Sequence, residues 1–245
     1  MSVFRNYSLL RTPNLGLITY VGSASNPADN GLMNTSPVAV TPLSMKAGDL
    51  VYLMAQNREI QANITSIAMS QLGGQLWTEV MTFGGTGVDP PTMKLFTCRF
   101  NGTWSASPSV AFVTTTPVNS AVMHVFRPAN PAYNWRVDGS AIGAWSDAVP
   151  PFQGLITGVT PTKNVNVTIA SWHAGSAVTF TNLVGTGWAT LGANQYRNLA
   201  GSDQSMSFAY KIQNTLTATG DVQKDVSAGG GGVTSIITFY QNKFL

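Results

Sequence analysis

Hydrophobic and polar residues alternate with a period of two along much of this chain, whereas the spacing typical of helices is nearly absent. Segment 206–212 is the clearest case, and segments 164–169 and 178–181 alternate in the same way. Because successive side chains of a strand point to opposite faces, each segment predicts a strand with one buried face and one face in water. Segments 50–55 and 121–126 are apolar on both faces. They predict central strands covered on one side by the opposite sheet and on the other by a further surface, such as a neighbouring subunit.

Turn-forming residues separate these segments. Leu72-Gly73-Gly74, Asp89-Pro90-Pro91 and Asn101-Gly102 each interrupt the alternation, and Asn-Gly is a strong signal for a tight hairpin. Many short strands with this punctuation favour an all-β fold, here a jelly-roll-like antiparallel β-sandwich.

The pattern also repeats once along the chain. Segment 48–55 matches 163–170, segment 93–96 matches 206–209, and segment 121–126 matches 235–240, with offsets of 115, 113 and 114 residues. Trp77 and Trp188 pair at an offset of 111 residues and are expected to plug the core. This collinearity predicts a β-sandwich over 17–245 built from two related halves of similar strand order.

The limits of these halves follow from the residues outside the repeat. The halves are predicted at about 17–127 and 160–245, joined by a Pro- and Trp-containing bridge at 128–159. The bridge is expected to run over the outside and to be held down by its tryptophans. Residues 1–16 end in Thr-Pro-Asn and are predicted to form an extended N-terminal arm that needs a partner surface to be ordered.

Charge is unusually scarce. Only 9% of the residues are charged, against about 25% in an ordinary soluble domain. This deficit favours surfaces that are buried between subunits, and hence a homo-oligomer. The net charge of +3 comes from few acids and from scattered basic residues, which does not favour nucleic-acid binding. No signal peptide and no membrane span are expected, because no apolar segment is long enough.

Candidate catalytic and metal-binding residues are sparse. The single cysteine, Cys98, lies on the apolar face of an expected strand and is interpreted as a small buried hydrophobe. His124 is expected to be a hydrogen-bonded residue of a sheet, and His173 is expected at a strand end, where a loop begins. Asp138 and Asp147 are the best-placed carboxylate pair, but neither a catalytic residue, a metal site nor a cofactor site is predicted.

The tryptophans are the other candidate binding residues. Trp104, Trp135, Trp145 and Trp172 are expected in or beside loops. There they would either pin loops or form exposed platforms for subunit contacts or sugar stacking.

Several short motifs resemble a class of β-sandwich structural proteins of tailed bacteriophages. The motifs are Ile18-Thr19-Tyr20-Val21-Gly22-Ser23-Ala24, Val40-Thr41-Pro42, Lys46-Ala47-Gly48-Asp49-Leu50-Val51, Gln75-Leu76-Trp77-Thr78 and Val125-Phe126-Arg127. The second half keeps a Gly187-Trp188-Ala189-Thr190 element where the first has Gln75-Leu76 before its tryptophan. The resemblance covers roughly residues 17 to 245 and implies no catalytic residues.

The resemblance implies a non-enzymatic virion protein that is made in the host cytoplasm. The first expectation is a capsid decoration (cement) protein that contacts copies of itself and the major capsid protein. The alternative is a tail or tail-fibre adhesin that binds a host surface glycan. The candidate contact residues are Phe4, Tyr7, Leu9 and Leu10 in the arm, and Trp135 and Trp145 in the bridge.

Overall fold

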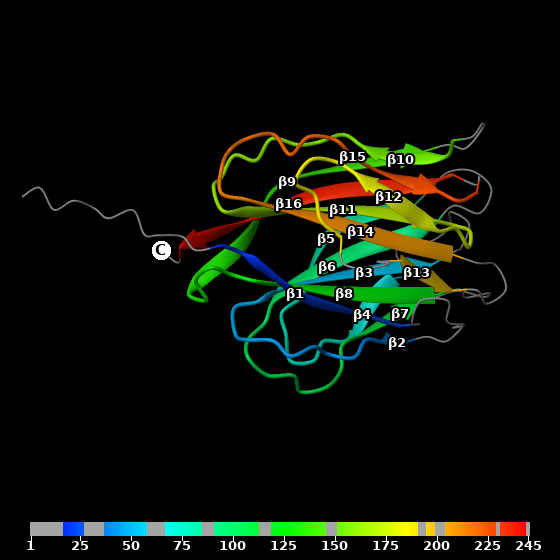
Figure 1. Ribbon diagram of the computed structural model, residues 1–245. Coiled ribbons are helices and arrows are strands. Elements are labelled where there is room, and N and C mark those ends of the chain that lie inside the picture. Colours follow the sequence, from blue (N-terminus) through cyan, green and yellow to red (C-terminus); the bar gives the residue numbers. More distant parts are fainter. Residues whose placement is uncertain are drawn as a thin grey trace, which may run out of the picture.

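A computed structural model describes residues 17–26, 37–57, 67–84, 91–112, 119–145, 151–190, 195–198, 204–228 and 231–243. The arm 1–16, with its four candidate contact residues, lies outside these ranges. The described residues form sixteen β-strands and no helix (Figure 1). The strands are β1 (Thr19–Asn26), β2 (Val38–Ala39), β3 (Leu50–Asn57), β4 (Ile67–Gln71), β5 (Thr78–Gly84), β6 (Thr92–Arg99), β7 (Ser109–Phe112), β8 (Asn119–Arg127), β9 (Tyr133–Trp145), β10 (Gln153–Ile156), β11 (Asn166–Ala174), β12 (Phe180–Val184), β13 (Gln195–Asn198), β14 (Gln204–Gln213), β15 (Val222–Val226) and β16 (Gly232–Lys243).

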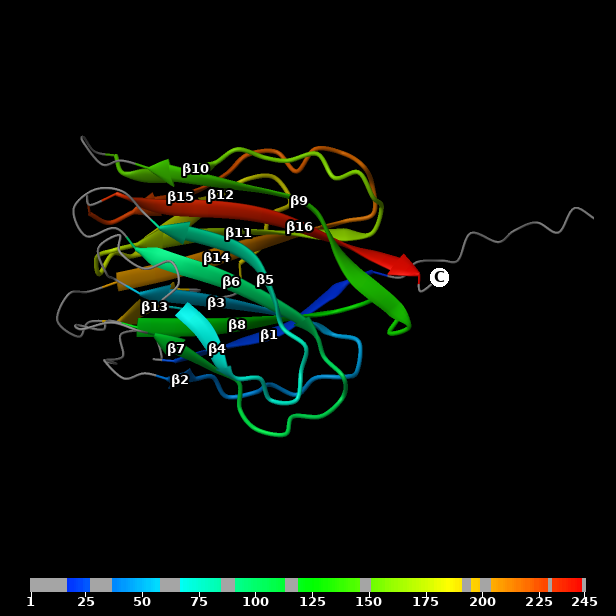
Figure 2. The same cartoon turned by 180° about the vertical axis from the view of Figure 1, so that it is seen from behind.

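These strands build four antiparallel sheets stacked as layers, seen from opposite sides in Figures 1 and 2. The outer layers are the three-stranded sheets β2-β7-β4 and β10-β15-β12. The inner layers are the five-stranded sheets β1-β8-β3-β6-β5 and β13-β14-β11-β16-β9. The all-β antiparallel sandwich is therefore confirmed, while its jelly-roll description stays a prediction.

The first half of the molecule (β1–β8) and the second half (β9–β16) have the same strand order. Raising each strand number of the first half by eight gives the order of the second in both sheets. A bulge interrupts the first strand of each half, between Tyr20 and Gly22 in β1 and at Asp138 in β9. The shared order and the shared bulge are structural features of a duplicated unit.

The register of the repeat differs from the sequence alignment at one element. Tyr52 of β3 lies opposite His124 of β8, and Val167 of β11 lies opposite Phe239 of β16. With Tyr52 matched to Val167, β8 matches β16 at an offset of 115 residues. The aligned offset of 114 is therefore wrong by one residue, which exchanges the two faces of the strand.

Three hydrophobic cores fill the spaces between the four layers. The first core lies within the first half, around Leu53, Phe96 and Met123, and the second core lies within the second half, around Trp172 and Phe180. The central core lies between the two five-stranded sheets and joins the halves. It comprises Ile18, Leu50, Tyr52, Met54, Met81, Met93, Leu95, Val122, Phe126, Val165, Val167, Ile169, Met206, Phe208, Val233, Ile237 and Phe239.

This layering explains the segments that are apolar on both faces. All eight residues of β3 are buried, with alternate side chains in the first core and in the central core. The surface expected from a neighbouring subunit is supplied by the other half of the same chain.

Two predictions of a wet strand face are wrong. Asn166 and Thr168 of β11, and Ser207 of β14, are fully buried beneath the outer sheet β10-β15-β12. Their polar groups are paired instead of hydrated, as when the Thr168 and Thr238 hydroxyls hydrogen-bond at 2.8 Å. In β12, by contrast, Phe180 is buried and Thr181 is exposed, as the alternation predicts.

The bridge 128–159 is not an irregular outer connection, because it contains β9 and β10. Its start, Pro128–Ala132, is free of regular structure. This turn is tied to the first half by Arg99, which donates to the carbonyl oxygens of Pro131 (2.5 Å) and Tyr133 (3.3 Å). The predicted hairpin at Asn101-Gly102 is also wrong, because the connection there leads from β6 to β7 in the outer sheet.

Candidate functional site

The most triad-like set of side chains lies at the junction of the two halves. The Ser171 hydroxyl lies 2.9 Å from His173 Nε2, and His173 Nδ1 lies 2.9 Å from Gln56 Oε1. Ser171 and His173 come from β11, where they are two residues apart and so share the central face. Gln56 comes from β3 of the first half. A nucleophile, a base and an orienting group stand in this order in serine hydrolases, with an acid where this chain has an amide.

This set is closed to substrates. All three side chains are fully buried, and burial lowers the pKa of His173 from 6.5 to about 3. The imidazole is therefore neutral at physiological pH, with one ring nitrogen donating and the other accepting. It bonds the halves together in the interior instead of activating a nucleophile toward solvent.

The polar network extends from this set across the junction. Gln56 Nε2 donates to the Ala174 carbonyl at 2.8 Å, and Gln204 Nε2 donates to the Ser120 hydroxyl at 2.6 Å. Ser171 also hydrogen-bonds Ser235 on β16. Each of the first two bonds joins a residue of one half to a residue of the other. The network thus specifies how the inner sheets are aligned.

His124 is the second buried histidine of the junction. Tyr20 Oη lies 3.1 Å from its Nδ1, and its ring stacks on Phe208 of the second half with centroids 3.6 Å apart. Burial lowers its pKa from 6.5 to about 3. The prediction of a hydrogen-bonded sheet histidine is confirmed, and His173 lies at a strand end as predicted, being the next-to-last residue of β11, where it is fully buried.

Cys98 and Lys224 are also enclosed. Cys98 is buried in the first core, and burial raises the pKa of its thiol, as expected for a small hydrophobe. Lys224 of β15 lies between the second half's sheets, where burial lowers its pKa from 10.5 to about 8. Its Nζ donates to the Ser207 hydroxyl at 2.7 Å.

The carboxylates that the structure describes hold strands and turns. Asp49 is fully buried and receives two hydrogen bonds from Arg127, at 3.2 and 2.9 Å, at the junction of β3 and β8. Asp138 accepts from the backbone N–H and the hydroxyl of Thr162. Asp147, its suggested partner, lies outside the described residues.

Across the described ranges, no group of three or more His, Cys, Asp or Glu residues is arranged to hold a metal ion. Nor do those ranges contain a helix of the length and hydrophobicity that crossing a bilayer requires.

Trp77 and Trp188 contact the cores as predicted, whereas other tryptophans expected in or beside loops lie in strands. Trp145 and Trp172 lie in strands β9 and β11 and are buried in the second core, so neither is a loop platform. Trp188 is buried in the same core. Trp77 packs against the first core and stacks with Trp104, with the ring centroids 6.4 Å apart. Trp145 is thus removed as a contact candidate.

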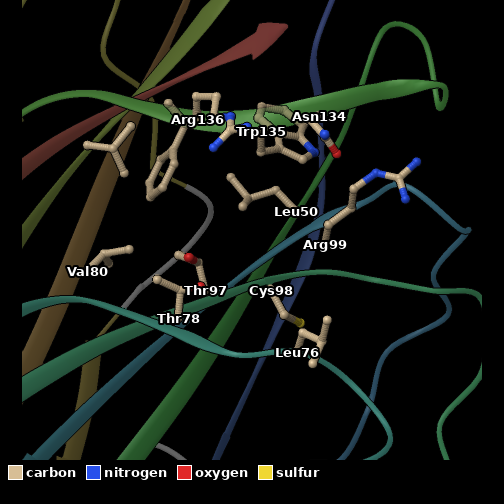
Figure 3. A pocket seen from close by; sticks show the side chains of 12 residues that line it. Leu50, Leu76, Thr78, Val80, Thr97, Cys98, Arg99, Asn134, Trp135 and Arg136 are labelled. Carbon is tan, nitrogen blue, oxygen red and sulfur yellow. The ribbon is translucent and has the colours of Figure 1, made fainter. Parts of the chain in front are cut away.

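Trp135, the remaining candidate, lies on β9 beside an open cavity of about 330 Å³ (Figure 3). The cavity opens where the edge strands β5 and β9 of the two inner sheets face one another. It is lined by Leu50, Leu76, Thr78, Val80, Thr97, Cys98, Arg99, Asn134, Trp135, Arg136, Val137 and Phe239. In Figure 3, Asn134, Trp135 and Arg136 follow β9 on one side, and Thr78 and Val80 lie on the other.

The cavity lining combines positive charge with apolar surface. It contains two arginines and no acid. Arg136 is exposed, and its side chain has no hydrogen bond or ion pair within the described part of the chain. Trp135 is half-buried, and its Nε1 donates to the Gly48 carbonyl at 2.9 Å. An anionic or polyhydroxylated group matches such a lining better than a cation does.

Sequence reasoning missed Arg99, Asn134 and Arg136. These residues come from β6 of one half and β9 of the other, and no local motif links them. Only the packing of the halves brings them to one cavity.

Comparison with known proteins gave no match to a family model, to a curated protein or to a solved structure.

Proposed function

We propose that this protein is a non-enzymatic structural component of a bacteriophage virion, and specifically a capsid decoration protein that acts as a homo-oligomer. It would stabilise the particle through contacts with its own copies and with the major capsid protein.

Exposed hydrophobic residues along one side of the molecule carry this proposal. Leu76, Val137, Ile142 and Leu155 are 92, 45, 41 and 53% exposed. They come from the segment just before β5, from β9 and from β10, which lie along one side of the layered stack (Figure 2). Such a concentration of apolar surface on a chain with so few charges marks a protein interaction site.

The interior chemistry supports the same proposal. The arrangement Ser171–His173–Gln56 joins the two halves and is shielded from solvent. Its hydrogen bonds therefore stabilise the structure. A rigid four-layer block with apolar sides is suited to cementing, which depends on buried area.

Co-sedimentation with capsids that lack this protein tests the proposal. We expect the binding of the full chain to such capsids to saturate at a copy number that matches the capsid symmetry. The bound protein should also raise the resistance of the capsids to heat. Deleting residues 1–16 should reduce this binding at least tenfold, because the proposal places Phe4, Tyr7, Leu9 and Leu10 on a neighbour.

A deletion variant that keeps the wild-type unfolding curve but binds poorly would support the arm as the anchor. Failure of the full-length protein to sediment with capsids would contradict the decoration role.

The cavity beside Trp135 favours a second candidate function, that of a tail or fibre adhesin for a host glycan. Its positive charge, its indole and its amide are the groups that bind acidic sugars. Trp145 no longer contributes to this candidate.

Arg136→Ala is the variant that tests it, because Arg136 is exposed and has no partner among the described residues. Binding of acidic host polysaccharide, followed by calorimetry, should fall about tenfold or more if Arg136 pairs with a sugar carboxylate. Lys163→Ala removes an exposed charge that does not line the cavity and is the matched control. Equal binding by both variants would exclude the cavity as the glycan site.

A further inference from the structure

The free edge of β9 is an unusual feature of the second half. β9 has thirteen residues and pairs with β16 along one side, from Tyr133 opposite Lys243 to Trp145 opposite Gly232. At its first residue, the Tyr133 N–H donates to the Asn130 carbonyl and the Tyr133 carbonyl accepts from Arg99. Beyond Tyr133, no backbone hydrogen bond is made along this other side within the described part of the chain. In an antiparallel strand every second residue directs its N–H and C=O outward. The free edge of β9 is therefore a row of unused donors and acceptors.

The other edge strands of the described sheets are shorter or interrupted. β2, β10 and β13 have two, four and four residues. β1, β4, β5 and β12 have eight, five, seven and five residues, and each contains a bulge. Short length and bulges are the usual protections of an edge against pairing with another chain.

β9 lacks these protections in its second half. Its bulge at Asp138 lies near the middle of the strand and leaves Gly139–Trp145 as an unbroken segment. The run Gly139–Ala144 contains neither a charged residue nor a proline, and all six residues are exposed. A long, uncharged edge of this kind is a template for an added strand.

A shallow groove accompanies the free edge. It has a volume of about 220 Å³ and lies between β9 and β10, lined by Ala141, Gly143, Leu155 and Ile236 among others. The groove exists because Ala141 and Gly143 are small and face β10. Apolar side chains of an incoming strand would fill it, burying the exposed Leu155.

We propose that the free edge of β9 pairs with the β9 strand of a second copy of this chain, antiparallel and about a two-fold axis. The inner five-stranded sheets of the two copies would then join into one continuous sheet. This inference deepens the proposed function by naming the surface that joins copies, and rests on that function only for its biological context.

Charge is the reason for choosing a second copy as the occupant. The charged residues of β9 are Arg136 and Asp138, of opposite sign. In antiparallel pairing centred on Ala141, within the unbroken segment, Asp138 faces Ala144 of the second copy. No like charges meet in this register, so self-pairing has no electrostatic penalty.

A cysteine scan of β9 tests the pairing and its register. Cys98 is the only natural cysteine and is buried, so an introduced cysteine is the sole accessible thiol. The variants are Gly139→Cys, Ser140→Cys, Ala141→Cys and Ile142→Cys; a Cβ at Gly139 meets nothing within 4 Å. Directly opposed residues lie about 4.5–5.5 Å apart, within the Cα separation of a disulfide.

We expect mild oxidation to give a disulfide-linked dimer, with a rate that peaks at one position or two adjacent positions and falls at least tenfold elsewhere. Ala68→Cys, on the exposed β4 edge of the outer sheet, is the matched control and should stay monomeric.

Mass measurements without oxidant provide the second readout. The wild-type chain, 26.0 kDa as a monomer, should dimerise at micromolar concentration. Ala141→Lys should weaken the dimer about tenfold or more by placing like charges across the axis, while Ala68→Lys should not. Light scattering and unfolding curves of both variants separate lost pairing from lost folding.

A monomer at every concentration, with cross-linking of all four β9 variants as slow as that of Ala68→Cys, would overturn this inference. Uniform rates along β9 would equally overturn it, because they indicate random collision. The decoration role fails separately, if a dimeric protein ignores capsids.

Discussion

Lowering the pH from 7 to 4.5 is expected to reduce the free energy of unfolding by about 5 kcal/mol. The cause is the pair of histidines buried at the junction of the halves. Burial lowers the pKa of both His124 and His173 from 6.5 to about 3. A loss of this size is comparable to the whole stability of many domains, so unfolding near pH 4.5 follows.

The sign of this pH dependence follows from proton binding by the folded and unfolded states. Between pH 6.5 and pH 3 the unfolded chain binds a proton on each histidine and the folded chain does not. Acid therefore stabilises the unfolded state, and stability rises with pH through this window. Above pH 6.5 both states are neutral at these sites and the effect disappears. Most carboxylates stay ionised above pH 4.5, so the window isolates the histidines.

Denaturant unfolding at several pH values measures the effect. Between pH 6 and 4.5 the free energy of unfolding should fall by about 2.7 kcal/mol for each pH unit in the wild type. In His173→Gln the slope should be about half of this, because one titrating group remains. The slope is informative even if the variant is less stable at pH 7. His124→Gln is the matched variant and should halve the slope equally.

A free energy of unfolding that stays constant from pH 7 to 4.5 would contradict the burial of both histidines. An unchanged slope in His173→Gln would show that other groups cause the acid sensitivity.

The sequence pattern predicted the fold class because period-two alternation is a local property of strands. It failed wherever polar residues are buried. Asn166 and Thr168 look like solvent-facing residues, yet both are fully buried, and Thr168 is paired with Thr238 across adjacent strands. Alternation shows which residues share a face, but not what covers that face.

Local sequence patterns also failed to predict strand β9. Its start follows Pro128 and Pro131, which predict irregular structure, and its middle is Gly139-Ser140-Ala141, which has low strand propensity. The strand forms because β16 offers it a complementary edge twelve residues long. This tertiary pairing outweighs local propensity, and both the cavity and the free edge depend on it.

Phe208→Ala is expected to reduce the free energy of unfolding by about 3–5 kcal/mol, the usual cost of emptying a buried phenylalanine site. Phe208 belongs to β14 of the second half, but its ring stacks on His124 of β8 and lies 5.7 Å from Tyr20 of β1, measured between centroids. The cavity would therefore open in the central core, between the halves. Leu216→Ala, at an exposed site, is the control and should change stability by less than about 0.5 kcal/mol.

The more informative result is where the destabilisation appears. Each half presents a whole apolar sheet face to the other, and Leu50, Tyr52 and Met54 would be exposed if the halves parted. The halves should therefore unfold in one cooperative transition, and Phe208→Ala should lower amide-exchange protection in β6 of the first half as much as in β14. Peptide-level hydrogen exchange measures both at once. If β6 kept its wild-type protection while β14 lost its own, the central core would not couple the halves, and the duplicated unit would be a pair of independent domains.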